Sequence, residues 1–168
     1  MAILQDKLIT LPHKKYVDYL RVVYTEMAKY VPEDAYIIEI GARHDRGVIS
    51  KQVIPHRTFI SVDRNLSRGD LHTNVLVEDL PDADVVISTC VLHHTKEADI
   101  CQLLSHMNAP LLMFSGPNAD VMPELFGDHL WHIEIDKLSG WLEDLGYIVE
   151  WSPIGLSEPF CELLVIAR

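Results

Sequence analysis

The sequence is poor in cysteine and contains no long apolar run. Its three cysteines, Cys90, Cys101 and Cys161, are widely spaced and form no CxxC pair. This spacing excludes a disulfide framework and a cysteine-rich metal site, and it favours a reducing cytoplasmic setting. No apolar stretch approaches the roughly 18 residues of a membrane helix, and the charged N-terminus does not resemble a signal peptide. We therefore expect a cytoplasmic protein with no membrane partner.

Cations are also scarce, since the net charge is −11. The charge is uneven: residues 43–68 carry +4 and residues 69–168 carry −14. Broad nucleic-acid binding needs an extended cationic surface, so the acidic body argues against a nucleic-acid partner. The basic segment is either a site for one anionic group or a solvated face. Nothing in the pattern indicates the oligomeric state.

The length of 168 residues suits one domain with a real core. We predict a single domain over 1–168, with an N-terminal helical segment at 1–32 and a core at 33–168. In the first segment, apolar residues recur at helical spacing over 14–31, and Pro32 ends the pattern.

The core alternates short apolar runs with helical patterns, which is typical of a doubly wound sheet. Runs without alternation predict buried strands at 35–40, 58–62, 74–77, 84–89 and 109–115. Helical patterns fall at 46–54, 95–107 and 136–145, and two strands at 147–153 and 160–167 suit an antiparallel hairpin. We therefore predict an α/β, Rossmann-like sheet of seven mostly parallel strands with helices on both faces. Ligands bind at the carboxyl ends of such strands.

Glu39 and Gly41 close the first strand. An acid in a strand buried on both faces needs a partner, which a backbone amide or a ligand's ammonium group can supply. The alternative is that Glu39 caps the following helix. A nucleotide-cradling loop normally has further glycines, but Arg43 and Asp45 occupy those places.

Further polar residues follow the second, third and fourth strands. Asp63 stands 24 residues after Glu39, where an acid can accept hydrogen bonds from two ribose hydroxyls; otherwise it belongs to a surface turn. Glu78 or Asp79 lies within reach of an adenine amino group. Thr89 and Cys90 end the fourth strand.

Two adjacent histidines, His93 and His94, follow that strand. They cannot share one helix face, so we expect at most one to point into the site. Without a third ligand they predict no metal site. A catalytic role and a local hydrogen-bonding role both remain open for them.

Together these segments resemble class I S-adenosylmethionine-dependent methyltransferases, and the resemblance covers nearly the whole chain. The segments that carry it are "IIEIGA", "FISVDRN", "DLPDADVVISTCVLHHT", "LLMFSGPN" and "LSGWLEDLGYIVEW". The resemblance implies S-adenosylmethionine as the cofactor. It would place Glu39 at the cofactor's amino group, Gly41 and Ala42 beside its methionine part, Asp63 on the ribose, Arg64 beside the adenine, Glu78 or Asp79 at the adenine amino group, and Thr89 or Cys90 at the sulfonium.

The chain departs from that family in its first motif, which usually contains three glycines. Only Gly41 is kept, and side chains at Arg43 and Asp45 restrict the loop. Arg43 could instead pair with the cofactor's carboxylate through charge-assisted hydrogen bonds.

The resulting hypothesis is methyl transfer to an oxygen or nitrogen of a small molecule, with His94 or His93 as the base. Segments 1–13 and 117–135 would form a small lid. The second segment contains Asn118, Phe126, His129, Trp131 and His132, which form either a substrate-side surface or ordinary packing over the sheet.

Three alternatives remain. The first is an NAD(P)-binding Rossmann protein that uses Asp63, or Arg64 with Arg68 on a 2′-phosphate. The second is a methyltransferase-like scaffold or binding protein without catalysis. The third is an enzyme that uses the same cofactor, or its decarboxylated form, for other chemistry such as aminopropyl transfer.

Overall fold

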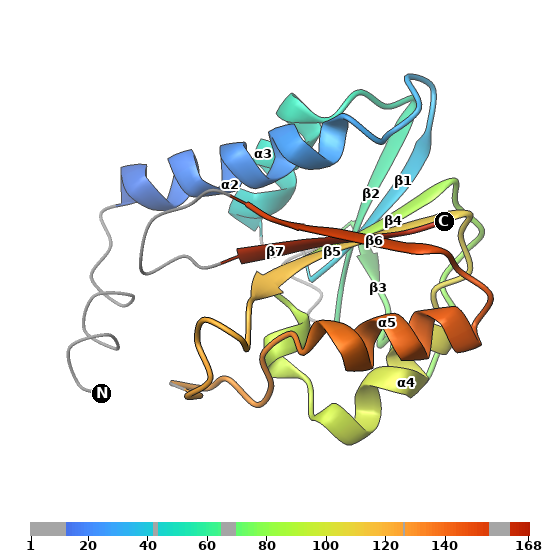
Figure 1. Ribbon diagram of the computed structural model, residues 1–168. Helices are drawn as coiled ribbons and strands as arrows, with labels where there is room; N and C mark the ends of the chain where they lie inside the picture. Colours follow the sequence, from blue (N-terminus) through green and yellow to red (C-terminus); the bar gives the residue numbers. More distant parts are fainter. Residues whose placement is uncertain (1–12, 42–43, 65–69, 126, 155–161) are drawn as a thin grey trace.

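A seven-stranded sheet forms the centre of the computed structural model, which describes residues 13–41, 44–64, 70–125, 127–154 and 162–168 (Figure 1). The helices are α2 (His13–Ala28), α3 (His44–Val53), the short 3₁₀ helix η1 (Leu92–His94), α4 (Glu97–Ser105) and α5 (Ile135–Asp144). The strands are β1 (Tyr36–Ile40), β2 (Thr58–Asp63), β3 (Leu71–His72), β4 (Val85–Thr89), β5 (Leu111–Pro117), β6 (Val149–Pro153) and β7 (Glu162–Ala167).

The strand order is β3-β2-β1-β4-β5-β7-β6. Strands β1 to β5 pair in parallel, whereas β7 runs antiparallel to both β5 and β6. The doubly wound sheet with a C-terminal antiparallel hairpin is therefore confirmed. The predicted hairpin loop falls mostly on residues 155–161, outside the described residues.

Helices cover both faces of the sheet, with α2 and α3 on one face and α4 and α5 on the other (Figure 1). Alternation along β1 divides its side chains between two cores. Ile37 packs toward α2 and α3, and Ile38 and Ile40 pack toward α4 and α5. Burial on both faces explains why the central strands are apolar without a period of two.

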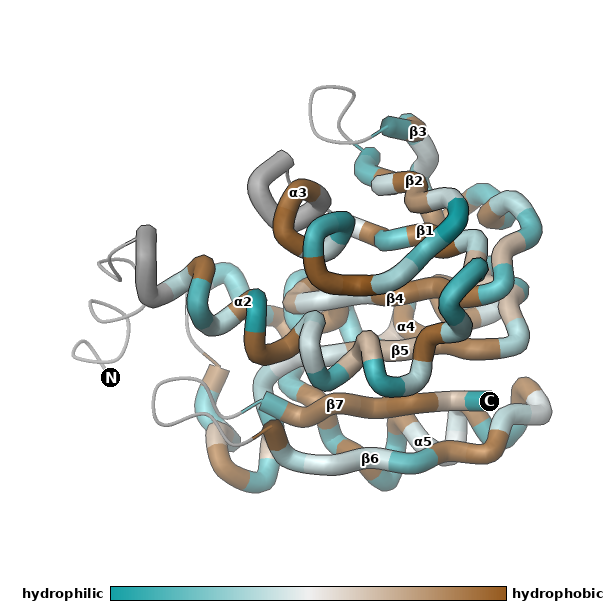
Figure 2. The backbone as a smooth tube through the Cα atoms, turned by 90° about the horizontal axis from the view of Figure 1, so that it is seen from above, coloured by the Kyte–Doolittle hydropathy of each residue, from teal (hydrophilic) through white to brown (hydrophobic). Residues whose placement is uncertain are grey.

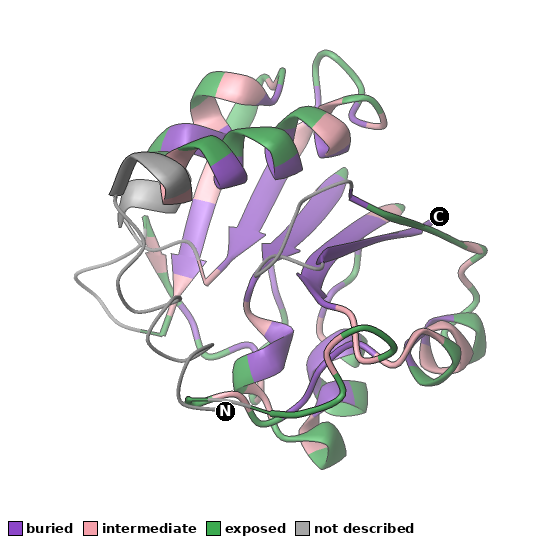
Figure 3. Cartoon of the chain, turned by 60° about the vertical axis from the view of Figure 1, so that its left-hand side comes forward, coloured by how far each residue is buried: buried purple, intermediate pink, exposed green. Residues whose placement is uncertain are grey.

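The outermost strand has a different composition from its neighbour. All residues of β7 are buried, whereas four of the five residues of β6 are exposed. The tube in Figure 2 is accordingly apolar along most of β7 and paler along β6, and Figure 3 shows the buried residues concentrated in the central strands.

The predicted third strand at 74–77 is wrong. The structure has a two-residue strand at Leu71–His72, and a turn follows it. The Asn74 side-chain oxygen accepts from the Leu76 amide at 3.2 Å, and the Asn74 carbonyl accepts from the amides of Val77 and Glu78. An asparagine that bonds to the backbone two residues on favours a turn over a strand, which outweighs the short apolar run.

Helix α2 ends three residues earlier than its apolar spacing predicted. Its last turn tightens, because the amides of Lys29 and Tyr30 bond to carbonyls three residues back. Val31 remains buried and packs against the same core.

The different burial of two leucines predicts that they contribute very differently to the free energy of unfolding. Leu104 is 1% exposed and Leu145 is 45% exposed. Leu104→Ala should lower the free energy of unfolding by about 2–5 kcal/mol, because it removes buried methyl groups and leaves a cavity. Leu145→Ala should change it by less than about 0.5 kcal/mol. Urea unfolding measures both values, and similar losses would contradict the assigned core.

Candidate functional site

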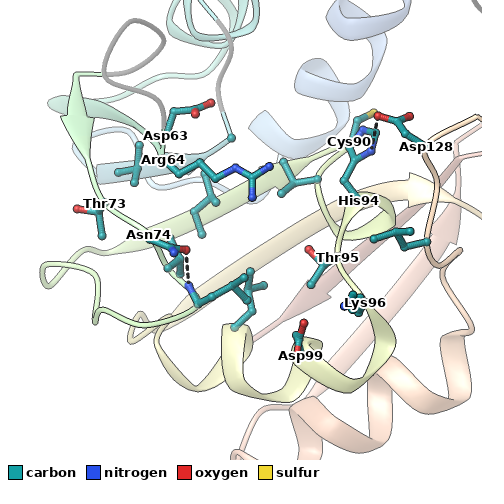
Figure 4. Close-up of a pocket in the computed structure, with 18 residues that line it drawn as sticks. Asp63, Arg64, Thr73, Asn74, Cys90, His94, Thr95, Lys96, Asp99 and Asp128 are labelled. Carbon is teal, nitrogen blue, oxygen red and sulfur yellow. Dashed lines mark hydrogen bonds and ion pairs between the residues drawn. The ribbon is translucent and has the colours of Figure 1, made fainter.

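A cavity of about 540 Å³ opens at the carboxyl ends of the parallel strands (Figure 4). Asp63, Arg64 and Asn74 lie at one end, and Cys90 and His94 lie at the other, beside Asp128. Its apolar walls include Val62, Val75, Leu76, Val91, Leu103 and Leu130. Cavities of this size bind small molecules and cofactors.

The cavity lies where the strand order reverses, between β1 and β4. Gly41 follows β1 and Cys90 follows β4, and both have positive φ, +67° and 55°. A Cβ built on Gly41 would lie 2.4 Å from Cγ2 of Val91, which no real contact allows. Glycine is therefore required at 41 for two reasons: its backbone angle and the closeness of the segment after β4.

Asp63 and Arg64 line the cavity at the end of β2, as the sequence predicted for residues at strand ends. The backbone around them is tied to the β3 segment. The Thr73 amide donates to the Asp63 carbonyl at 3.3 Å, and Nε2 of His72 bonds to the Arg64 carbonyl. Asp63 thus lines the cavity together with Thr73 and Asn74.

Glu39 lies outside the cavity, although it is only two residues from Gly41. Its side chain is fully buried. One carboxylate oxygen accepts from the Tyr24 hydroxyl of α2, and the other accepts from Oγ of Ser50 in α3 at 2.6 Å. Glu39 thus contacts the two helices that cover this face of the sheet.

Thr89 and Cys90 face in different directions. The Thr89 hydroxyl contacts Sδ of Met27 in α2 at 3.9 Å, and Thr89 is not among the residues that line the cavity. Cys90 lines the cavity. Its thiol also lies 3.0 Å from the Tyr19 hydroxyl and 3.6 Å from a carboxylate oxygen of Glu162. Burial, followed by the charges of Cys90 and Glu162, raises the pKa of Tyr19 well above its ordinary value, so its hydroxyl is the donor to Glu162.

Glu78 and Asp79 are exposed and do not line the cavity. Asp79 pairs with Nδ1 of His106 at 2.5 Å. The predicted contact of one of these two acids with an adenine stays a prediction. Ala42 and Arg43, predicted beside the methionine part, lie outside the described residues, as does Phe126.

Of the two adjacent histidines, His94 lines the cavity and His93 is buried behind it. Their rings pack with two more histidines of the segment after β5. Ring centroids lie 4.0 Å apart for His93 and His94, 4.1 Å for His93 and His129, and 5.0 Å for His129 and His132. The predicted substrate-side segment and the histidine pair are therefore one cluster.

The hydrogen bonds in this cluster indicate which ring nitrogens carry a proton. Nδ1 of His132 lies 2.6 Å from the Met122 carbonyl, which can only accept, so Nδ1 carries the proton. In neutral His132, Nε2 then accepts from Nδ1 of His129 at 2.8 Å. Burial, followed by the charges of His132 and His94, lowers the pKa of His129 to about 4, against a smaller opposite effect of Asp128. His129 is therefore neutral at pH 7.

Asp128 is a site residue that the sequence did not reveal. Its carboxylate lies 3.3 Å from Nδ1 of His94, and it lines the cavity. The Leu130 amide donates to the His93 carbonyl at 2.7 Å and fixes this segment against η1. The available signal was an aspartate beside a histidine in the loop after the fifth strand. Nothing in the sequence distinguished it from other surface acids.

Two further findings limit the kind of site. Within the described part of the chain, no three His, Cys, Asp or Glu side chains are placed to hold a metal ion. No described helix is both long enough and apolar enough to cross a membrane.

The chain matches no protein-family model and no curated protein. Solved structures match over most of its length. The small RNA methyltransferase HEN1 is 21% identical over 92% of this chain, with a TM-score of 0.64, although the chain spans only 25% of that structure. The N-methyltransferase NodS from Bradyrhizobium japonicum WM9 is 15% identical, with a TM-score of 0.69 and coverage of 90% of this chain and 96% of NodS.

A third match is magnesium protoporphyrin IX methyltransferase (ChlM) from Synechocystis PCC 6803 with bound S-adenosylhomocysteine. It is 13% identical, with a TM-score of 0.60 and coverage of 92% of this chain and 82% of ChlM. At these identities the likeness shows the fold. The chain has the fold of class I S-adenosylmethionine-dependent methyltransferases, as its resemblance to that family predicted.

The contact between Gly41 and Val91 predicts an unusually large cost for one added methyl group. Gly41→Ala places a Cβ against Val91 and also strains the backbone. Gly127→Ala at φ +59°, where no atom lies within 4 Å of the added Cβ, has only the backbone cost of about 1–2 kcal/mol. Gly41→Ala should lower the free energy of unfolding by more than Gly127→Ala, as measured by denaturant titration.

The double variant Gly41→Ala with Val91→Ala tests the cause, because it removes the nearest atoms. It should recover part of the loss caused by Gly41→Ala. Equal losses for the two glycines, or no recovery, would contradict the close approach of these segments.

The low pKa of His129 predicts a loss of stability in weak acid. The unfolded chain binds a proton at residue 129 below about pH 6.5, whereas the folded protein resists it down to about pH 4. His129 therefore causes a loss of stability as pH falls from about 6.5 to 4. Gln at 129 can still donate to His132 and does not titrate. Urea unfolding from pH 7 to pH 4.5 should show a smaller acid loss for His129→Gln; an unchanged slope would refute this role.

Proposed function

We propose that the protein is an S-adenosylmethionine-dependent methyltransferase that methylates an oxygen or nitrogen of a small molecule. One observation carries the proposal: a single cavity at the strand reversal joins Asp63 at the end of β2 to His94 and Asp128 beside η1. The methyltransferase fold supports it. The first end suits the nucleoside of a cofactor, and the second suits the acceptor.

The residues at the first end fit the cofactor. A carboxylate at the end of β2 offers two acceptor oxygens to the vicinal hydroxyls of a ribose. Gly41 places no Cβ at the point where the strand order reverses. Val75 and Leu76 supply an apolar surface beside Asn74. When bound, S-adenosylmethionine supplies an electrophilic sulfonium methyl group. The protein's own side chains would bind the two substrates and accept the proton.

At the second end, His94 is the proposed general base. Nδ1 faces the Asp128 carboxylate at 3.3 Å, which is an electrostatic contact longer than a good hydrogen bond. The carboxylate favours the tautomer with the proton on Nδ1, so Nε2 has the lone pair that accepts a proton from an acceptor hydroxyl or amine. It also stabilises the imidazolium that results.

Charge and shape at this end favour a small acceptor. Asp128 lies beside the apolar side chain of Leu130 on the cavity wall, and Val121 and Leu125 of the same segment are 59% and 47% exposed. Such a surface suits a partly apolar molecule better than a polyanion, and the net charge of −11 also opposes nucleic acid. HEN1 is named as a small RNA methyltransferase, and that substrate is a property of HEN1 alone.

Calorimetric titration with S-adenosylmethionine, S-adenosylhomocysteine and NADP tests the cofactor. The two sulfur nucleosides should bind and NADP should not. Asp63→Ala should weaken binding of S-adenosylhomocysteine by about 1–3 kcal/mol, because two ribose hydroxyls lose a charged acceptor. Asp82→Ala is the matched control, since Asp82 is exposed and lies outside the cavity. A folded protein that binds neither sulfur nucleoside, or that binds NADP instead, would overturn the proposal.

Transfer of a labelled methyl group tests the chemistry. Incubation with methyl-labelled S-adenosylmethionine and a cell extract should place label in the small-molecule fraction. His94→Gln should lower the rate about 100-fold or more, as expected for loss of a general base. Asp128→Asn should have a smaller effect, because the Asp128 side chain is 83% exposed.

Label in the nucleic-acid fraction would contradict the small-molecule assignment. Tight binding of S-adenosylhomocysteine with no label in any fraction would favour the non-catalytic scaffold instead.

A further inference from the structure

We propose that Glu39 is a positioning residue that shapes the cofactor site from behind its wall and does not contact the cofactor's amino group. It would do so by holding helix α3 and the turn at Gly41 in place against α2. For the identity of the ligand, this inference rests on the proposed function.

The contacts of Glu39 join three elements. The residue belongs to β1, Tyr24 belongs to α2 and Ser50 belongs to α3, and all three side chains are fully buried. Tyr24 donates to Oε1 and Ser50 donates to Oε2 at 2.6 Å. Hydrogen bonds to an ionised carboxylate are about twice as strong as neutral ones, and a buried carboxylate is costly without them. The two hydroxyls therefore fix where α2 and α3 lie on β1.

The direction of the side chain separates Glu39 from the cavity. Ile37 lies on the same face of β1 and packs into the α2 core, whereas Ile40 lies on the opposite face and lines the cavity. Glu39 itself is not among the residues that line the cavity. An amino group in the cavity would therefore meet the face of β1 opposite to the one that carries this buried carboxylate.

We call the contacts of Glu39 with Tyr24 and Ser50 the clamp. The chain connects this clamp to Gly41 in the proposed cofactor site. Gly41 is two residues after Glu39, and its amide donates to the Val62 carbonyl at 2.7 Å. Helix α3 begins at His44, three residues after Gly41, and contains Ser50 in its second turn. A shift of α3 away from β1 must therefore pull on Gly41, because only two residues separate Gly41 from the start of α3.

A positioning role and an amino-group-binding role for Glu39 predict opposite orders of S-adenosylhomocysteine affinity among three variants. If Glu39 positions the loop, Tyr24→Phe and Ser50→Ala should each weaken binding of S-adenosylhomocysteine about fivefold, the equivalent of one net hydrogen bond. Glu39→Gln should lose no more than either, because the amide still accepts from Tyr24 and can donate to Ser50. If Glu39 binds the amino group, Glu39→Gln should lose most, and removal of either hydroxyl should leave affinity unchanged or higher.

A ligand without the amino group gives the decisive comparison. The analogue 5′-deoxy-5′-(3-carboxypropylthio)adenosine keeps the carboxylate and lacks the ammonium group of S-adenosylhomocysteine. Glu39→Gln should weaken both ligands by the same factor in calorimetric titration. A loss confined to S-adenosylhomocysteine would overturn the positioning role.

Amide hydrogen exchange of the ligand-free protein tests the clamp without any cofactor. Exchange in α3 should accelerate in Tyr24→Phe and in Ser50→Ala. Tyr147→Phe is the matched control, because its hydroxyl donates to the Ala109 carbonyl at 2.8 Å within the opposite core. That control should change neither α3 exchange nor S-adenosylhomocysteine affinity.

The outcomes separate this inference from the proposed function. If the wild-type protein binds no S-adenosylhomocysteine, the proposed function fails, and the exchange data still decide whether Glu39 holds α3. If the wild-type protein binds it and α3 exchange is unchanged in both hydroxyl variants, the proposed function stands and the clamp is refuted. Should Tyr24→Phe fail to fold, Ser50→Ala carries both measurements.

Discussion

The reversal of strand order between β1 and β4 is the constraint on which the site depends. The chain adds β2 and β3 on one side of β1 and β4, β5 and the hairpin on the other. The segments that leave β1 and β4 therefore diverge toward opposite faces, and a crevice remains above the boundary. Gly41 and Cys90 stand on either side of it, and both adopt positive φ. Asp63 and the His94–Asp128 pair reach the same crevice from the next elements outward, so one topological feature brings together both ends of the proposed reaction.

The face of the sheet beneath α2 supports that crevice with buried polar groups. Tyr24 of α2 donates to Glu39 on β1, and Tyr19, five residues earlier, donates to Glu162 on β7. Each carboxylate is buried and accepts a hydroxyl hydrogen bond from α2, so a shift of that helix would remove one of its donors. Such contacts add modest net stability, but they penalise any other position of α2 strongly. The same helix thus fixes the sheet near Gly41 on the proposed cofactor side and near Cys90 on the proposed acceptor side.

Much of the fold followed from the sequence, because central strands buried on both faces must be apolar, and the runs at 35–40, 58–62 and 84–89 fit that requirement. The run at 74–77 failed because Asn74 stabilises a turn through its own side chain, a local bond that hydropathy does not register. Residues at strand ends, such as Asp63 and Cys90, could be predicted to reach the site. Asp128 could not, since its position depends on how the segment after β5 packs on η1. The partners of Glu39 were also hidden, because Tyr24 and Ser50 belong to two separate helical patterns.

These contacts change the physical interpretation of the loop with a single glycine. Glycines let a loop approach a ligand closely, but they also leave it many conformations that binding must restrict. Here the one position with no room for a side chain keeps its glycine, since Val91 fills the space beside Gly41. Helix α3 begins three residues after Gly41, and Glu39 connects that helix to the strand that precedes Gly41. A loop with side chains, held at both ends, loses less conformational freedom on binding than a loop of glycines. Its affinity for a cofactor would then depend on the buried hydroxyls beneath it as much as on the residues that face the ligand.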